Sequence, residues 1–122
     1  MTAFRVLLVD DVEQVRRDLR TLLTLSDDLE IIGEAANGLE AVRLTESLQP
    51  DVVLMDLEMP VMDGYEATRQ IKTRFPSCRV ITLTMHDYES ARLKAKQSGM
   101  DAFLVKGASV QSIVQTISKQ KE

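Results

Sequence analysis

The sequence predicts an α/β domain in which a parallel sheet of five strands lies between two layers of helices. Short aliphatic runs alternate along the chain with longer stretches whose apolar residues recur with the period of an α-helix. Gly, Pro and Asn residues stand at the boundaries between the two kinds of segment. Right-handed connections between successive strands then place helices on both faces of the sheet, which gives a three-layer α/β/α architecture of the (βα)5 kind.

The predicted strands are bounded runs of aliphatic, often β-branched residues, the composition expected of strands that are buried on both faces. In chain order they cover residues 6–9, 31–32, 52–55, 80–83 and 103–105. Pro50 stands just before the third run, and most of the runs end at a charged or hydroxyl-bearing residue. Runs this short, with such boundaries, favour strands over helices.

The predicted helices lie between and after these strands and are recognised by their apolar spacing. The spacing is clearest in the first and last helices, at Val12, Val15, Leu19, Leu22 and Leu23 and at Val110, Ile113, Val114 and Ile117. Weaker patterns cover residues 39–48, 66–75 and 89–98. Asn37 and Gly38 precede the second helix, and Pro76 and Gly99 follow the third and fourth, so turn-forming residues bracket these segments.

Length and composition indicate a single domain, which we expect to span residues 1–122. The 15 Lys and Arg residues against 19 Asp and Glu give a net charge of −4, which disfavours direct nucleic-acid binding. No apolar run approaches the roughly 20 residues of a membrane span, and no secretory signal opens the chain. With one cysteine, Cys78, and one histidine, an internal disulfide and a Cys/His zinc site are excluded. We therefore expect a cytoplasmic domain.

Chemically active side chains stand directly after four of the predicted strands. They are Asp10 and Asp11 after the first strand, Asp56 after the third, Thr84 after the fourth and Lys106 after the fifth. Parallel strands end at the same edge of a sheet, and ligands of open parallel sheets bind beyond that edge. The three carboxylates, the hydroxyl and the ammonium are therefore expected to converge from separate parts of the chain.

Three neighbouring carboxylates repel one another, and one lysine does not neutralise them. A bound cation resolves the repulsion, and a small set of oxygen ligands favours Mg²⁺, with Mn²⁺ as a substitute. A carboxylate beside Mg²⁺ can also attack phosphorus and form an aspartyl phosphate. Asp56 is the better candidate for this role, because Asp10 and Asp11 stand as a pair suited to the metal. Each residue alone is typical of a turn, a helix cap or a solvated surface, so the prediction depends on the set.

Four stretches of the sequence resemble the receiver domain of two-component response regulators. They are VLLVDD at residues 6–11, DVVLMDLEMPVMDG at 51–64, VITLT at 80–84 and DAFLVKG at 101–107. The resemblance covers essentially the whole chain and implies a flavodoxin-like sheet with the strand order 2-1-3-4-5. It also implies that the domain is not an enzyme: the only reactions that it catalyses would be its own phosphorylation and dephosphorylation.

The resemblance implies specific roles for the residues at the predicted sheet edge. Asp56 would be the phospho-acceptor, and Asp10 and Asp11 would form the acidic metal pocket. The backbone carbonyl of Glu58 would be the third protein ligand of Mg²⁺, and Lys106 would be the partner of the phosphate.

The resemblance also implies a switch. Thr84 would be the switch hydroxyl, which moves toward the phosphate, and Phe103 the switch aromatic, which then turns inward. Glu58 and His86 fall at positions where receivers vary and where the dephosphorylation rate is tuned.

One departure from the general receiver pattern indicates a subfamily. Lys106 is followed by Gly107, where many receivers have proline, and this resembles the NarL/FixJ-type subfamily. Its members usually carry a helix-turn-helix DNA-binding domain after the receiver, and that output domain is absent from these 122 residues. The resemblance therefore implies a receiver from a longer regulator of transcription; the alternative is a stand-alone receiver that acts by protein–protein contact.

The resemblance implies protein partners for such a domain. A sensor histidine kinase or a phosphotransfer protein would donate the phosphoryl group. An output domain or partner protein would contact the face formed by the fourth helix, the fifth strand and the fifth helix. Whether the domain forms a homodimer on phosphorylation is left open by the sequence.

Two other classes of protein share part of this pattern. A haloacid-dehalogenase-type phosphohydrolase also combines an aspartyl nucleophile with Mg²⁺, Thr and Lys, but its nucleophile typically lies in a DxD-like motif on the first strand of its core. Here the acidic pair precedes Asp56, and Asp56-Leu57-Glu58 is not that motif. A flavodoxin-like FMN carrier needs a Ser/Thr/Gly-rich phosphate loop after the first strand, where Asp10 and Asp11 would repel the phosphate. Both classes are disfavoured.

Overall fold

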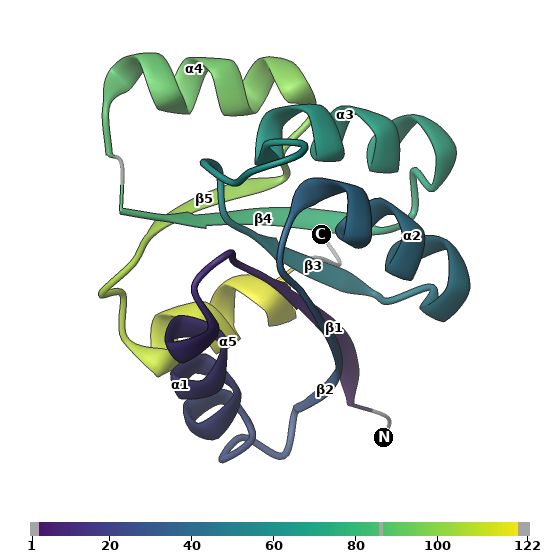
Figure 1. The fold of residues 1–122 in the computed structure, drawn as a ribbon. Helices are drawn as coiled ribbons and strands as arrows, with labels where there is room; N and C mark the ends of the chain where they lie inside the picture. Colours follow the sequence, from purple (N-terminus) through teal and green to yellow (C-terminus); the bar gives the residue numbers. More distant parts are fainter. Residues whose placement is uncertain (1–2, 86, 120–122) are drawn as a thin grey trace.

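The computed structural model describes residues 3–85 and 87–119, and strands alternate with helices as the sequence predicts (Figure 1). The strands are β1 (Phe4–Val9), β2 (Leu29–Ala35), β3 (Val52–Met55), β4 (Arg79–Thr84) and β5 (Ala102–Val105). The helices are α1 (Glu13–Leu23), α2 (Gly38–Leu48), α3 (Gly64–Arg74), α4 (Glu89–Ser98) and α5 (Val110–Ser118). All neighbouring strands pair in parallel, in the order β2-β1-β3-β4-β5, which confirms the expected flavodoxin-like sheet.

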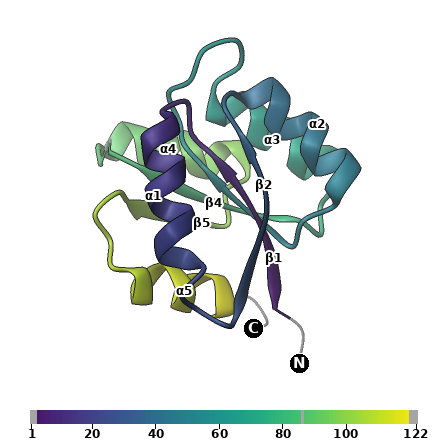
Figure 2. The ribbon, with the colours of Figure 1, turned by 60° about the horizontal axis from the view of Figure 1, so that its bottom comes forward.

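Helices cover both faces of the sheet. α1 and α5 lie on one face and α2, α3 and α4 on the other, as Figure 1 and Figure 2 show. Alternate residues of a strand point to opposite faces, so β1 contributes to two separate cores. Val6 and Leu8 pack in a cluster with Ile113 of α5, whereas Leu7 and Val9 pack in the cluster that includes the buried apolar side chains of α2 and α3. No helix in the described part of the chain has the length and apolar character that crossing a membrane requires.

Local hydrogen bonds define where several helices begin and end. The side chain of Asn37 accepts the backbone N–H of Glu40 at the start of α2, and that of Asp63 accepts the N–H of Glu66 at the start of α3. Gly99 ends α4 with φ at +102°, a conformation that glycine adopts without steric conflict. The turn-forming residues seen in the sequence therefore mark real element boundaries.

Two details differ from the sequence-based expectations. β2 covers Leu29–Ala35 and is much longer than the predicted 31–32, because two glutamates and a glycine interrupt its apolar run. This strand lies at the edge of the sheet, where polar side chains are tolerated. In addition, Val12 lies just before α1 and is 47% exposed, and Leu22 is 44% exposed, so the buried stripe of α1 is narrower than the apolar spacing indicates.

Candidate functional site

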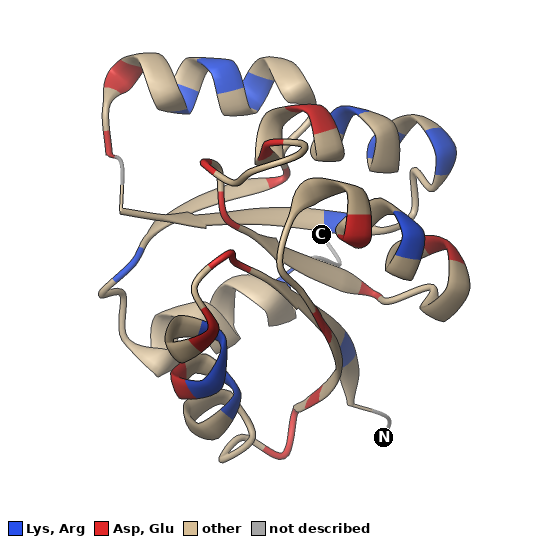
Figure 3. Cartoon of the chain, in the orientation of Figure 1, with Lys and Arg blue, Asp and Glu red and all other residues tan. Residues whose placement is uncertain are grey.

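One end of the sheet brings together the side chains that the sequence places after the strands. Asp10 and Asp11 follow β1, Asp56 follows β3, Thr84 is the last residue of β4 and Lys106 follows β5. Figure 3 shows acidic segments beyond β1 and β3 and a basic segment beyond β5, all at the same end of the sheet. The backbone N–H of Lys106 donates to the carbonyl of Thr84 at 2.6 Å. This hydrogen bond links the ends of β4 and β5 at the site.

Asp10, Asp11 and Asp56 form a cluster of carboxylates. One oxygen from each of the three side chains lies within 4.8 Å of the others. Asp10 and Asp56 are buried, whereas Asp11 is exposed. Carboxylate oxygens are the ligands that hard divalent cations prefer, and carboxylates this close repel one another without a cation. The cluster could therefore hold a metal ion.

Lys106 supplies the counter-charge within the cluster. Its ammonium group forms an ion pair with Oδ2 of Asp10 and lies 3.5 Å from Oδ1 of Asp56. The other oxygen of Asp10 accepts the backbone N–H of Val12 at 2.9 Å. Asp10 is thus held through both of its oxygens. The ammonium of Lys106 lies farther from Asp56 than from Asp10.

The surroundings of Asp56 alter its titration. The pKa of Asp56 is raised from 3.8 to about 6, mainly by burial and then by the negative charge of Asp10. The ammonium of Lys106 and the backbone N–H of Leu57 oppose this rise without cancelling it. At neutral pH, Asp56 is therefore an ionised carboxylate that is poorly solvated, and perturbed groups of this kind are typical of functional sites.

The backbone around Asp56 is held by strand pairing and by the start of α3. The N–H of Asp56 donates to the carbonyl of Val9 at 3.0 Å, and the N–H of Gly64 donates to the carbonyl of Leu57 at 2.8 Å. A Cβ on Gly64 would lie 2.0 Å from the backbone oxygen of Asp56. Only glycine therefore allows α3 to begin this close to Asp56.

Thr84 and Phe103 lie on the adjacent strands β4 and β5. Thr84 is fully buried, and Phe103 is half-buried. The guanidinium of Arg92, from α4, lies over the Phe103 ring at 4.5 Å from its centroid. Nε of Arg92 also donates to Oδ1 of Asp87 at 2.6 Å, so the arginine is held in place over the ring.

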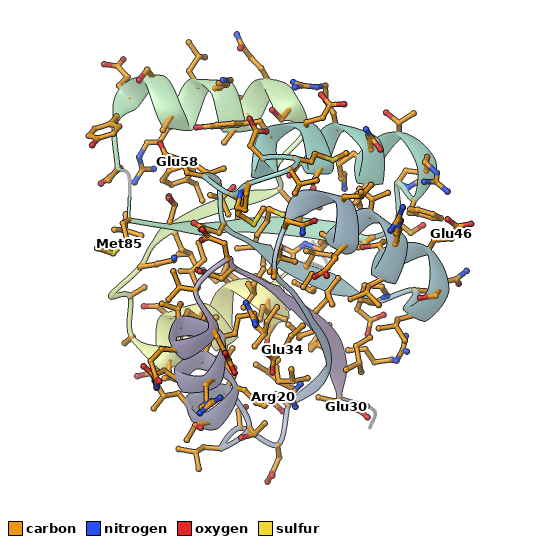
Figure 4. All side chains as sticks on the ribbon, viewed as in Figure 1. Arg20, Glu30, Glu34, Glu46, Glu58 and Met85 are labelled. Atoms are coloured by element: carbon orange, nitrogen blue, oxygen red, sulfur yellow. The ribbon has the colours of Figure 1, made fainter. Side chains whose placement is uncertain are left out.

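The structure describes one of the two residues expected at rate-tuning positions. Glu58 is exposed on the loop between β3 and α3, where Figure 4 labels it. Its negative charge contributes to raising the pKa of Tyr65, after the larger effect of burial. His86 lies outside the described residues.

Sequence reasoning missed two arginines that contact the site or its neighbours. Arg16, on α1, donates to the backbone carbonyl of Asp10, and Arg92, on α4, covers Phe103. A basic residue on an amphipathic helix is usually solvated, and nothing in its local spacing distinguishes one that reaches across to another element. Only the packing of the helices on the sheet reveals these contacts.

Comparison with known proteins identifies the family. The model of the response regulator receiver domain matches residues 6–118, which is nearly the whole chain. The chain belongs to the response regulator receiver family. Receivers of this family are regulatory domains of two-component systems that interact with histidine kinases and output domains, and they are not classical enzymes. This membership decides against the phosphohydrolase and FMN-carrier alternatives.

Named relatives support the NarL/FixJ type. The chain is 39% identical over 112 residues to the uncharacterized transcriptional regulatory protein YhcZ of Bacillus subtilis. The aligned residues cover 92% of this chain and 52% of that protein. It is 38% identical over 120 residues to the response regulator protein VraR of Staphylococcus epidermidis. Here the aligned residues cover 98% of this chain and 57% of that protein. The chain thus spans about half the length of these curated relatives.

A solved structure agrees with this grouping. A LuxR-family DNA-binding response regulator from Staphylococcus aureus superimposes with a TM-score of 0.89 at 32% identity, covering 95% of this chain and 97% of that chain. That regulator's structure and this chain therefore share the fold, and their sequences are related over nearly the full length of both.

Proposed function

We propose that this receiver is a phosphorylation-controlled switch in which Asp56 accepts a phosphoryl group. The observation that carries the proposal is the pairing of Asp56 with Lys106. A buried, ionised carboxylate faces an ammonium 3.5 Å away, with Asp10 and Asp11 alongside. A nucleophile, a group that can hold phosphate oxygens and candidate metal ligands therefore stand in one place.

The proposed reaction is a phosphoryl transfer to a carboxylate. An oxygen of Asp56 attacks the phosphorus of a phosphohistidine or of a small acyl phosphate. The bond from phosphorus to the donor nitrogen or oxygen breaks, and the donor leaves with the electron pair of that bond. The product is an aspartyl phosphate, with Lys106 and the hydroxyl of Thr84 as donors to its oxygens. Water hydrolyses this acyl phosphate, which returns the free carboxylate and releases inorganic phosphate.

The carboxylate cluster fits Mg²⁺, with Mn²⁺ as a substitute. Its donors are oxygens only, and one of them, on Asp11, is exposed, so water can complete the coordination. The residues that would hold the ion are Asp10, Asp11, Asp56 and the backbone carbonyl of Glu58. When bound, the ion neutralises charge on the phosphoryl oxygens and so reduces their repulsion by Asp56.

The proposed output is a change in the face that carries α4 and β5. Thr84 moves toward the new phosphate, and Phe103 turns inward into the space that Thr84 leaves. Phosphorylation shifts this equilibrium only to the extent that the phosphate contacts one state better than the other. Glu58 and His86 are proposed to tune the rate of dephosphorylation.

We further propose a place for the domain in a longer regulator. A sensor histidine kinase or phosphotransfer protein donates the phosphoryl group in the cytoplasm. Residues 1–122 form the receiver, and a helix-turn-helix output domain controls transcription in the full-length protein. The LuxR-family relationship supports this reading.

The surface of α4, β5 and α5 contacts the output domain, a partner or a second copy, and the receiver itself contacts neither nucleic acid nor membrane. A stand-alone receiver remains the alternative.

The test of the proposed function is phosphorylation by acetyl phosphate in Mg²⁺. Intact mass spectrometry is expected to show the mass of one added phosphoryl group that hydroxylamine removes. Asp56→Asn is expected to show no gain. Asp27→Asn, the same change at an exposed turn just before β2 and so away from the carboxyl ends of the strands, is expected to behave as wild type. An equal gain in Asp56→Asn, or no gain in wild type, contradicts the proposal.

A further inference from the structure

Asp11 differs from the other two carboxylates in how it is held. Asp10 is fixed by Lys106 and by the N–H of Val12, and Asp56 is buried beside Lys106. Within the described part of the chain, the Asp11 carboxylate takes part in no hydrogen bond or ion pair, and the side chain is exposed. No contact with another described side chain holds the Asp11 carboxylate, so the conformation of its backbone is what sets the position from which this side chain reaches the cluster.

That backbone is held by Arg16. Nη1 of Arg16, on the first turns of α1, donates to the carbonyl oxygen of Asp10 at 2.6 Å. This carbonyl belongs to the peptide group that joins Asp10 to Asp11, so the hydrogen bond fixes the plane from which the Asp11 side chain departs. The Arg16 side chain is only 15% exposed, so its guanidinium is shielded from competition with water.

Arg16 is itself anchored by a carboxylate on another element. Its Nε donates to Oε1 of Glu34 on β2 at 3.0 Å, and Nε of Arg20 donates to the second oxygen of Glu34 at 2.6 Å. Figure 4 shows Glu34 and Arg20 side by side between β2 and α1. The hydrogen bond from Arg20, followed by that from Arg16, lowers the pKa of Glu34, so its carboxylate is ionised at neutral pH. The planar guanidinium of Arg16 is thus held by Glu34 through Nε, while its Nη1 donates to the carbonyl of Asp10.

We propose that Arg16, held by Glu34, is a positioning residue that orients the Asp10–Asp11 peptide and thereby sets the affinity of the carboxylate cluster for a divalent cation. This inference rests on the proposed function, because it assumes that the cluster binds such a cation. Arg16 touches neither the metal nor the phosphoryl group in this scheme and acts through the backbone of Asp10.

Charge and positioning give opposite expectations for removal of Arg16. Arg16 is a cation beside a cation site, so if its charge alone mattered, its removal would tighten Mg²⁺ binding. If it positions the peptide, its removal weakens binding, and loss of a group that orients metal ligands typically lowers metal affinity about 10-fold to 100-fold. The sign of the change therefore distinguishes the two roles.

The experiment compares Arg16→Met with Arg17→Met. Arg17 is the next residue on the same helix, is exposed and pairs only with Glu13 among the described residues, so both variants remove one positive charge. Binding of Mg²⁺ is measured by calorimetry and binding of Mn²⁺ by electron paramagnetic resonance. We expect binding about tenfold weaker in Arg16→Met and unchanged or slightly tighter in Arg17→Met. Equal or tighter binding in a folded Arg16→Met overturns the inference.

A second variant and a metal-free measurement protect the test against misfolding. Arg16→Lys keeps the charge but lacks the planar fork, and it is expected to weaken binding as well. In EDTA, the backbone amide of Val12, which donates to Asp10, is expected to exchange with solvent faster in both Arg16 variants than in Arg17→Met. Unchanged exchange and unchanged binding in Arg16→Lys overturn the inference. Absence of Mg²⁺ binding in wild type overturns both the inference and the proposed function, whereas normal binding in all variants overturns only the inference.

Discussion

The ammonium of Lys106 lies 3.5 Å from Oδ1 of Asp56 while it is ion-paired with Oδ2 of Asp10. One cation thus faces two buried carboxylates, and it is shared unequally between them. The charge of Lys106 lowers the pKa of Asp56, but burial and the charge of Asp10 outweigh it. The site is therefore short of positive charge in the absence of a metal ion, and the first two predictions follow from this imbalance.

In the metal-free protein, the contribution of Asp56 to stability is predicted to fall as the pH rises from about 4 to about 6. The pKa of Asp56 is raised from 3.8 to about 6 in the folded state, so in this range the folded protein binds more protons than the unfolded chain. The loss from this group is at most about 3 kcal/mol, since a tenfold change in a proton-binding constant corresponds to about 1.4 kcal/mol. Urea unfolding in EDTA across this range measures it.

Asp56→Asn is the control for this pH dependence. Glu34 acts with the opposite sign, because its pKa is lowered and its contribution is lost as the pH falls. The variant keeps Glu34 and removes only the Asp56 titration, so the difference between the two stability curves isolates Asp56. Asp56→Asn is expected to be the more stable protein at pH 7 without metal. Parallel curves for wild type and variant would show that Asp56 does not titrate as described.

Asp11→Asn is predicted to lose metal affinity without losing stability. Asp11 is exposed and contributes negative charge to the cluster, so its neutralisation removes repulsion and one candidate ligand together. The thermal midpoint in EDTA is expected to be unchanged or higher than in wild type, and the rise in midpoint on adding Mg²⁺ is expected to shrink. Strong destabilisation in EDTA would mean that Asp11 has a structural role instead. Asp27→Asn, at an exposed turn, is the matched control.

Gly64→Ala is predicted to disturb Asp56 directly. Its methyl group would lie 2.0 Å from the backbone oxygen of Asp56, so the start of α3 or the end of β3 must move. We expect a loss of about 2 kcal/mol or more in the free energy of unfolding, and slower phosphorylation by acetyl phosphate.

Gly99→Ala is the comparison for this substitution. Gly99 has φ at +102°, but its added methyl group would meet only the Lys72 side chain, at 3.2 Å. We expect a loss of about 1 kcal/mol from backbone strain and an unchanged phosphorylation rate. Equal phosphorylation rates in the two alanine variants would contradict the role assigned to Gly64.

Arg92→Met is predicted to favour the phosphorylated-like state. Arg92 covers the Phe103 ring and is held there by Asp87, so it stabilises the present position of the ring. A contact of this kind contributes about 0.5–1 kcal/mol at an exposed site. If Phe103 turns inward on activation, the variant is expected to bind beryllofluoride, a phosphoryl mimic, a few-fold more tightly in Mg²⁺. Lys96→Met, an exposed change on the same helix, is the control, and weaker binding in Arg92→Met than in this control would count against the switch.

Most of the fold was predictable from the sequence because its signals are local. The aliphatic runs, the helical spacing of apolar residues and the turn residues each depend on neighbours along the chain. The convergence of Asp10, Asp11, Asp56, Thr84 and Lys106 was also predictable, since parallel strands end at one edge whatever the details of packing. The edge strand β2 was underestimated because its glutamates break the local apolar pattern.

The amino-acid sequence by itself therefore determined the order of the elements and the edge at which the reactive side chains meet. Tertiary structure decided that Lys106 pairs more closely with Asp10 than with Asp56, that burial raises the pKa of Asp56, and that Arg16 reaches the carbonyl of Asp10. The physical reason is range: periodicity arises between residues a few positions apart, whereas burial and the choice of ionic partner depend on how helices and strands from distant parts of the chain pack against one another.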